Sequence, residues 1–528
     1  NRVVVPVLPE HFAVPNTALS PVSVNEGQDD AAVAQVRRRK SMVAMLDQSF
    51  DLPNNSGITG DNADAPLVRF ALRGMNESHA SQHTNPCRAH ERAIRQLRNL
   101  TSKSDENRRL ILAEKTVPLI LQSLRQYSTS DELHEQGCRL LSELVRGDDD
   151  GKREIISHGG LSFLVGSLND ETTPKVAVAV LSTLGILVEG SPEMQAMVAE
   201  FGGIGDALTM LGHNEVVVQT EALFLIEHLV SENAKNKDRL TDLDGTTRIL
   251  HVLETLPHNE ELAAQGTRAI SALVEGNLRI CDQLGCMGAV EIVVQVMEAN
   301  SKAPVVLHEG CRALRFLAFS DENRFRMGEK FAILSAVKAI VEMQRSPDYV
   351  MTGLLCLSNA TFDLSPNIYV AGISGGVDAT VCIMKLYPQH PDLLEAGCRV
   401  LRNLSDWIAT ACEQLILDTL ETVVQSMDSH FGTLGIQEHG LCMFVNLLQR
   451  GVHLVVDTRV ELLADRCIEA YDEDDTVRSA ALELHHLLQQ ARYEESQSKA
   501  GIGKLFSGTR LSMRGLIPGF GSPGDNGQ

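Results

Sequence analysis

A five-residue stretch decides the fold of this chain: GCRLL at residues 137–141 returns as GCRAL at 310–314 and as GCRVL at 397–401. The three glycines are 173 and 87 residues apart, which corresponds to four steps and two steps of about 43 residues. Self-similarity at a period between 20 and 50 residues is typical of repeat architectures. The spacing therefore predicts further, less obvious copies between the three.

Those copies are present along most of the chain. With the glycine of GCR as position zero, a small residue recurs at steps of 40 to 45 residues, and the residue seven positions later is leucine in nine of ten copies. The small residues are Ala93, Gly137, Ala177, Ala222, Gly266, Gly310, Gly353, Gly397, Gly440 and Ala480. A second echo, SDENR at 104–108 and again at 320–324, lies five steps apart. We expect about ten repeats.

Each repeat is expected to contain three helices. A short one with a polar start (ENRRLILA, 106–113) precedes a second (VPLILQSL, 117–124), which often opens with two glycines, as in GGLSFLVGSL at 159–168. The third and longest carries apolar residues at positions 0, +3, +4 and +7, which form one helical stripe. Pro304, Pro347 and Pro391 each precede a position zero by six residues, where proline fits the first turn of a helix. Because period-two strand patterns of useful length are absent, the fold class is an all-α, right-handed α-solenoid of about ten three-helix repeats.

Composition limits the function. The chain has 528 residues, 43% of them hydrophobic and only 4% aromatic, which suits a long stack of leucine- and alanine-rich helices. A net charge of −22 opposes binding to nucleic acid, and no apolar run is long enough to cross a membrane. The eleven cysteines form no C-x-x-C pair, which indicates reduced thiols in a cytoplasmic protein.

Catalytic motifs are missing from the sequence. It has no H-E-x-x-H, no G-x-S-x-G on a strand-to-helix turn and no phosphate-binding loop, so we expect no enzyme, no cofactor and no metal. The cysteines of GCR stand at position +1, where other repeats carry Val178, Leu223, Thr267 and Leu441. We therefore interpret them as small apolar filler between helices.

The repeat pattern resembles that of the armadillo repeat family. A short helix, a G-G-x-x-x-L-V-x-x-L helix and a long helix ending A-x-x-A-L-x-N-L form the family pattern, and AGCRVLRNL (396–404) and TGLLCLSNA (352–360) are similar to its last part. The resemblance covers about residues 85–490. It implies a non-enzymatic protein whose long helices line a concave groove that binds other proteins.

Arginine and asparagine recur on one face of the long helices. Arginine occupies position +2 in five repeats and asparagine position +6 in four, and these positions are one helical turn apart. This Arg/Asn row consists of Arg95, Asn99, Arg139, Arg268, Arg312, Asn359, Arg399, Asn403 and Asn446.

Two interpretations of the row remain open. In the importin-alpha type of armadillo protein the asparagines clamp the backbone of an extended peptide, and tryptophans stand where this chain has arginines. The resemblance, with that departure, favours an acidic or phosphorylated segment as ligand rather than a basic one. The structural alternative is that Arg95, Arg139 and Arg399 pair with the glutamates four residues earlier, Glu91, Glu135 and Glu395. Such pairs stabilise a helix by only about 0.2–0.5 kcal/mol each.

The two ends of the chain lack the repeat. Residues 1–84 are expected to be mostly disordered, with a helix around 31–48, and residues 85–490 form the array. Residues 491–528 form a basic, glycine-rich tail; its part from 499 to 528 carries a net charge of +3 and scattered apolar residues. The tail is a candidate for docking to a partner or to a membrane surface.

Together these patterns predict a cytoplasmic scaffold or adaptor that presents a groove to an extended segment of another protein. Two alternatives stay open. One is a structural component of a large cytoskeletal or axonemal assembly. The other is an armadillo-type exchange factor or chaperone of a GTPase.

Overall fold

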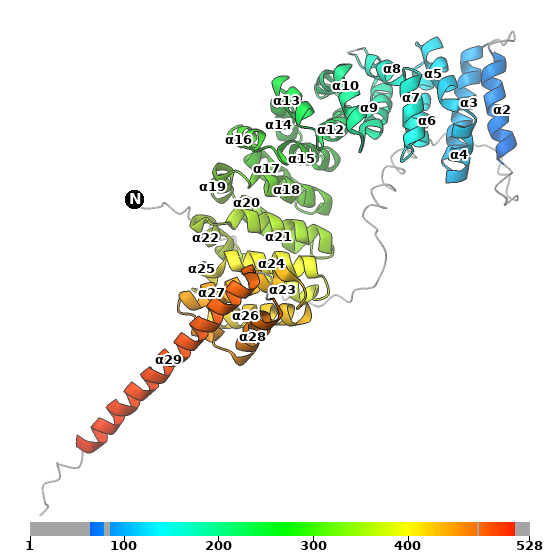
Figure 1. Ribbon diagram of the computed structural model, residues 1–528. Helices are drawn as coiled ribbons and strands as arrows, with labels where there is room; N and C mark the ends of the chain where they lie inside the picture. Colours follow the sequence, from blue (N-terminus) through cyan, green and yellow to red (C-terminus); the bar gives the residue numbers. More distant parts are fainter. Residues whose placement is uncertain (1–63, 79–84, 170, 472–474, 513–528) are drawn as a thin grey trace, which may run out of the picture. The chain divides into compact units, whose positions relative to one another are not determined.

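The computed structural model describes residues 64–78, 85–169, 171–471 and 475–512. The helix expected at 31–48 and the last part of the tail, 513–528, lie outside these residues. Within them the secondary structure is α-helical apart from one short 3-10 helix, and it contains no strand (Figure 1). The prediction of an all-α fold is confirmed.

The helices follow one another in the predicted order of short, medium and long. After α2 (Ala65–Ser78), the long helices are α3 (Pro86–Thr101), α6 (Asp131–Val145), α9 (Pro174–Val188), α12 (Val216–Val230), α15 (Glu260–Val274), α18 (Pro304–Leu317), α21 (Pro347–Thr361), α24 (Pro391–Asn403), α27 (Leu434–Gln449) and α29 (Asp475–Ser512). The first helices of the repeats are α4 (Asp105–Ala113), α7 (Asp149–Ser157), α10 (Pro192–Glu200), α13 (Ala234–Asp242), α16 (Leu278–Cys286), α19 (Asp321–Glu329), α22 (Ser365–Ile373) and α25 (Ser405–Ile408). The second helices are α5 (Thr116–Gln126), α8 (Gly160–Gly166), α11 (Gly203–Met210), α14 (Gly245–Thr255), α17 (Ala289–Ala299), α20 (Ala332–Glu342), α23 (Gly376–Leu386), α26 (Glu413–Ser429) and α28 (Thr458–Ala470). The 3-10 helix η1 (His453–Val455) lies between α27 and α28.

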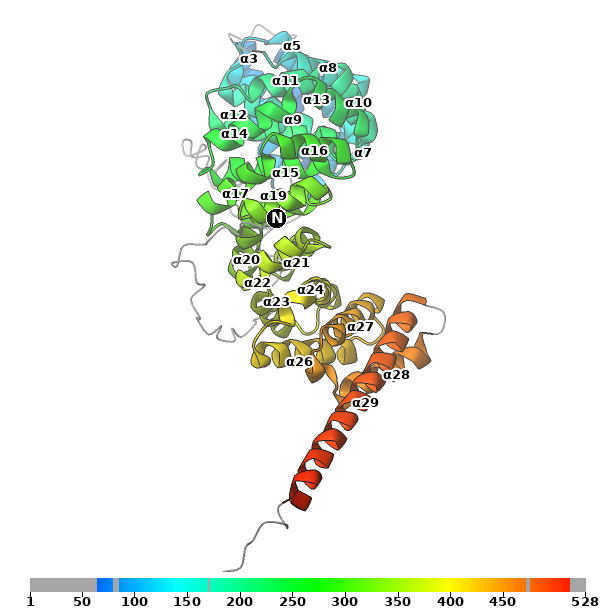
Figure 2. The same cartoon turned by 90° about the vertical axis from the view of Figure 1, so that its left-hand side faces the viewer.

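The chain divides into two compact units, residues 1–280 and 281–528. In the first unit the long helices α3, α6, α9, α12 and α15 pack in succession, and in the second α18, α21, α24, α27 and α29 do the same. Figure 2 shows α21, α24 and α27 following one another in chain order. Each unit is thus a stack of repeats in which a long helix contacts mainly its neighbours.

Position zero lies six residues after the first residue of most long helices, as Gly137 does in α6 and Gly310 in α18. This register corrects two of the sequence assignments. In α9 the equivalent residue is Val180 rather than Ala177, and in α29 it is Ala481 rather than Ala480. Ala177 is a small residue one helical turn before Val180, and both lie on the same buried stripe of α9. The sequence pattern therefore placed position zero at Ala177.

Each turn between a first and a second helix, except the one between α25 and α26, contains one residue in the left-handed backbone region. These residues are Lys115, Gly159, Gly202, Asp244, Gly288, Phe331 and Gly375. The double glycines follow from this turn: Gly159 has φ 64°, and a Cβ on Gly160 would lie 2.6 Å from Ile155 Cγ2. The first glycine allows the positive φ, and the second allows the close approach of the two helices.

The cysteines of GCR are packing residues, as expected. Cys138, Cys311 and Cys398 have no exposed surface, and burial raises the pKa of Cys138 and Cys398 to about 12. A thiol with such a pKa is not a nucleophile at neutral pH.

Among the described residues, no single helix is both long enough and apolar enough to cross a bilayer. Two bent helix pairs, α16 with α17 and α22 with α23, reach that length and composition only when each pair is taken together.

Candidate partner-binding surface

The Arg/Asn row lies on the less buried side of the long helices. Arg95 and Asn99 on α3 are exposed, and the other seven members are half-buried, whereas positions 0 and +7 are almost entirely buried. The helical period places positions +2 and +6 away from the apolar stripe, so the sequence spacing alone accounts for this exposure. The row is split between the two units.

Three members of the row meet in the second unit. The Arg399 side chain donates from Nε to Ser358 Oγ at 2.9 Å and from Nη2 to Asn359 Oδ1 at 2.8 Å. Asn403 Nδ2 donates to the carbonyl oxygen of Ser358 at 2.8 Å. Asn359 Nδ2 in turn donates to the carbonyl oxygen of Arg315 at 3.2 Å, so one polar network joins α18, α21 and α24. The network holds the Arg399 guanidinium in one orientation.

A second polar group continues this network toward α27. Arg402 Nη1 lies 3.4 Å from Glu438 Oε1 and 3.2 Å from His439 Nδ1. Because an arginine only donates, Nδ1 is the acceptor here and the neutral imidazole carries its proton on Nε2. Burial, and then the charges of Arg402 and Arg399, lower the pKa of His439 to about 4. The histidine is therefore neutral at pH 7 in a locally positive field.

The ion pairs expected within helices form only in part. Arg139 pairs with Glu135 at 2.9 Å, as predicted. Arg95 instead pairs with Glu132 of the next long helix, which corrects the expected pair with Glu91. Arg399 likewise bonds to α21 and not to Glu395. For Arg95 and Arg399 the partner comes from a neighbouring repeat, where the stacked helices place an acceptor within reach.

The remaining members lie apart from the network. Arg312 on α18 pairs with Glu309 at 3.5 Å, and Arg268 on α15 and Asn446 on α27 are half-buried. Sequence reasoning missed Ser358, Arg402 and His439, which connect the row in the second unit. Ser358 and Arg402 stand at position +5 and His439 at position −1 of their repeats. These positions border the helix face that carries positions +2 and +6, and this was the only signal in the sequence that could have identified them.

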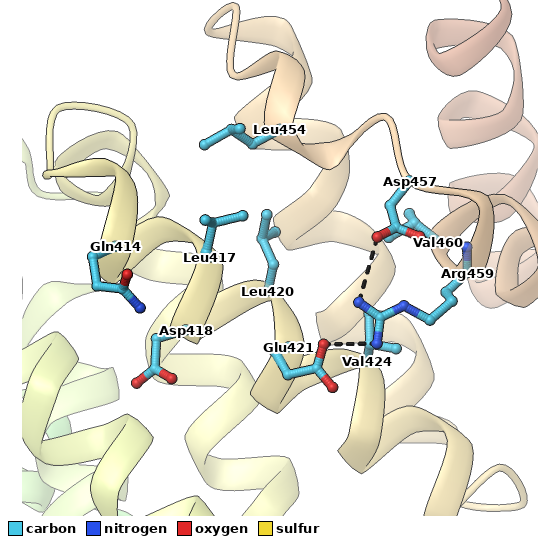
Figure 3. A pocket seen from close by; sticks show the side chains of 10 residues that line it. All are labelled: Gln414, Leu417, Asp418, Leu420, Glu421, Val424, Leu454, Asp457, Arg459 and Val460. Atoms are coloured by element: carbon cyan, nitrogen blue, oxygen red, sulfur yellow. Dashed lines mark hydrogen bonds and ion pairs between the residues drawn. The ribbon is translucent and has the colours of Figure 1, made fainter.

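The second unit also contains a pocket of about 290 Å³ between α26, η1 and α28 (Figure 3). Leucines and valines make up half of its lining residues, and Arg459 bonds to Glu421 at 2.7 Å and to Asp457 at 3.4 Å. The Arg459 side chain lowers the pKa of Glu421, and the backbone N–H of Arg459, followed by its side chain, lowers the pKa of Asp457. The described residues contain no cluster of three or more potential metal ligands.

Comparison with known proteins identifies similar structures but no sequence relative. No family model and no curated protein matches the sequence. The crystal structure of an engineered protein is similar with a TM-score of 0.66 and 18% identity, over 82% of this chain and 99% of that one. A chain from the structure "A conserved phosphorylation switch controls the interaction between cadherin and beta-catenin in vitro and in vivo" is similar with a TM-score of 0.61 and 16% identity, over 88% and 99% of the two chains. A designed armadillo repeat protein covers 46% of this chain with 99% of its own length, at 20% identity and a TM-score of 0.41.

Proposed function

Because the chain has the armadillo-repeat fold, we propose that it is a non-enzymatic, cytoplasmic scaffold that binds an extended acidic or phosphorylated segment of a partner protein along the long helices of its second unit. The fold alone does not define a function, so the proposal depends on the side chains of the surface. The observation that carries it is the network in which Arg399 is held between Ser358 and Asn359, with Arg402 beside His439.

The chemistry of this network suits an anion. A guanidinium group has five N–H donors, and the bonds of Arg399 to Ser358 and Asn359 use two of them. The others can bind a carboxylate or phosphate, and fixing the group beforehand reduces the entropy lost on binding. The Nε2–H of neutral His439 is a further donor, and Asn403 offers an amide to the ligand backbone.

One of the similar structures supports the same class of ligand. It concerns an interaction between cadherin and beta-catenin that a phosphorylation switch controls. For the present chain this favours a partner whose binding responds to added phosphate charge, which fixed arginines recognise well.

The test uses charge reversal in the full chain. Proteins retained by the immobilised wild type are compared by quantitative mass spectrometry with those retained by Arg312→Glu/Arg399→Glu. The matched control is Arg153→Glu/Lys302→Glu, which changes the same charge at side chains that are 69% and 82% exposed outside the row. We expect partners with acidic or phosphorylated segments to be lost from the row variant and kept by the control. Equal retention, with unchanged helicity by circular dichroism, would contradict the proposal.

A further inference from the structure

Exposed aromatic side chains gather in two consecutive repeats of the second unit. Phe319, Phe325, Phe362 and Tyr369 are between 46% and 58% exposed. Only 4% of the chain is aromatic, and the described residues contain just four other aromatic side chains among the large exposed hydrophobics. We call these four residues the aromatic corner, because they lie where long helices α18 and α21 turn into first helices α19 and α22.

The other repeats serve as an internal control for these positions. Phe319 and Phe362 stand at position +9, just beyond the long helix, and Phe325 and Tyr369 are the fifth residues of their first helices. At position +9 the other repeats carry Ser102, Arg146, Glu189, Ser231, Glu275, Asp406 and Gln449. At the fifth position of the first helix they carry Arg109, Arg153, Ala196, Asp238 and Asp282. Since the same packing tolerates polar or small residues elsewhere, folding does not require aromatic residues here.

Contacts make the corner continuous with its neighbours. The rings of Phe316 and Phe319 are 6.2 Å apart. Arg324 Nη1 lies 3.5 Å from the carbonyl oxygen of Ala318, next to Phe319, and its guanidinium carbon is 5.9 Å from the ring centre of Phe362. Arg324 therefore links the two turns, and the strip from Phe316 to Phe362 forms one surface.

This surface adjoins the Arg/Asn row. Positions +6 and +9 are about one helical turn apart, so Phe362 follows Asn359 on the same side of α21. We propose that the aromatic corner is the apolar half of the partner site, and that it binds aromatic or large aliphatic side chains that stand next to the carboxylates or phosphates of the partner segment. The proposal rests on the function proposed above and adds which residues of the partner determine specificity.

The charges around the corner favour a protein partner over a lipid surface. The adjoining helix α19 carries three carboxylates, Asp321, Glu322 and Glu329, and two guanidinium groups, so it lacks the excess of basic residues with which a protein surface binds an anionic membrane. Arg324, stacked over Phe362 and bonded to Asp321 at 2.6 Å, keeps a cation beside the rings. Aromatic residues, phenylalanine and tyrosine among them, and arginine are enriched at protein–protein interfaces.

The test selects ligands without assuming a partner. A phage library of random 16-residue peptides is selected on the immobilised full chain, and enriched peptides are synthesised with a fluorophore. Their affinities are measured by fluorescence anisotropy for the wild type, for Phe319→Ser/Phe362→Ser and for Arg312→Glu/Arg399→Glu. Phe201→Ser is the matched control, because Phe201 is 49% exposed in the first unit.

We expect enriched peptides to combine acidic residues with aromatic or large aliphatic ones, and to bind the Phe319→Ser/Phe362→Ser variant at least about tenfold more weakly than the wild type or the control. Replacing the aromatic residue of the peptide by alanine should weaken binding to the wild type but not to that variant. Peptides that lack such residues, or that bind this variant as well as the wild type, would overturn the inference.

The two proposals fail in different ways. Peptides that lose affinity for the phenylalanine variant but bind the arginine variant normally would contradict the acidic-ligand function and leave the apolar site standing. A selection that enriches no peptide would overturn both.

Discussion

Asparagine has two different roles in this protein, one when it is buried and another when it is exposed. Asn236, on the first helix α13, is 4% exposed, and its Nδ2 donates to the carbonyl oxygens of Leu229 at 2.7 Å and Gln195 at 3.3 Å. Asn367 in α22 caps Ala360 and Arg324 in the same way, both at 2.7 Å. Asn99, in contrast, is exposed on the long helix α3. Buried amides thus satisfy open carbonyls near the ends of α12 and α21, while exposed amides remain available to a ligand.

His439 should make stability depend on pH. Its pKa is lowered from 6.5 to about 4, so the unfolded chain binds more protons than the folded one between these values. Stability conferred at neutral pH is therefore lost as the pH falls through this window. The groups facing His439 are Arg399 and Arg402 on α24 and Glu438 on its own helix.

The variant His439→Gln lacks the titrating imidazole, and with it the contribution of His439 to the pH dependence of stability. The difference between urea midpoints at pH 7.5 and pH 5 should therefore be smaller in this variant than in the wild type. His258→Gln, at an exposed site of the first unit, is the control and should leave the difference unchanged. An equal pH dependence in His439→Gln and the wild type would contradict the assignment.

Where the second and the long helix of a repeat pack together, a glycine on the long helix faces a large side chain on the second helix. A Cβ on Gly310 would lie 2.5 Å from Met297 Cγ, and one on Gly397 would lie 2.6 Å from Met384 Sδ; each partner is thirteen residues earlier, on the second helix. A glycine on the long helix thus leaves room for the long methionine side chain of the second helix, and the two helices can pack closely.

Gly310→Ala should destabilise the second unit by about 1–3 kcal/mol, because the added methyl group overpacks the contact with Met297. The control is Gly205→Ala in α11, where no atom lies within 4 Å of the added Cβ. That change should stabilise by about 0.5–1 kcal/mol through the higher helix propensity of alanine. Urea denaturation measures both, and effects of the same sign would refute the size-matching account.

Each unit of the molecule is held together by contacts between neighbouring repeats. Each of the two units has its own succession of packed long helices. In such repeat arrays stability is close to a sum of local terms, so a defect should spread mainly to adjacent repeats.

Asn236→Ala tests this locality. It leaves the carbonyl oxygens of Leu229 and Gln195 without their buried donor and should destabilise the first unit by about 1–3 kcal/mol. Hydrogen exchange measured by mass spectrometry should show reduced protection in peptides around α10 to α13 and unchanged protection in residues 281–471. Asn99→Ala, at an exposed site, should change neither. A uniform loss of protection over both units would show that the chain unfolds as one cooperative whole.

Prediction from sequence succeeded where the signal is local. The period, the three helices per repeat and the packing role of the GCR cysteines all follow from spacing and residue size within about 40 positions. The register failed in the third repeat because Ala177 and Val180 lie one turn apart on the same buried stripe. The repeated sequence SDENR indicated the period, but its structural role was not predicted. Its asparagines, Asn107 and Asn323, donate to buried carbonyl oxygens.

The sequence by itself determined that this chain is an α-solenoid and which face of each long helix is buried, because hydrophobic periodicity is a property of single helices. Only the tertiary structure decided what each polar side chain binds. Arg95 and Glu132 are 37 residues apart, and Arg399 and Asn359 are 40 apart, so each pair exists only once the repeats are stacked. The aromatic corner is of the same kind. Its residues stand at equivalent positions of two successive repeats, far apart along the chain, and they form one surface only because equivalent turns of these repeats lie side by side.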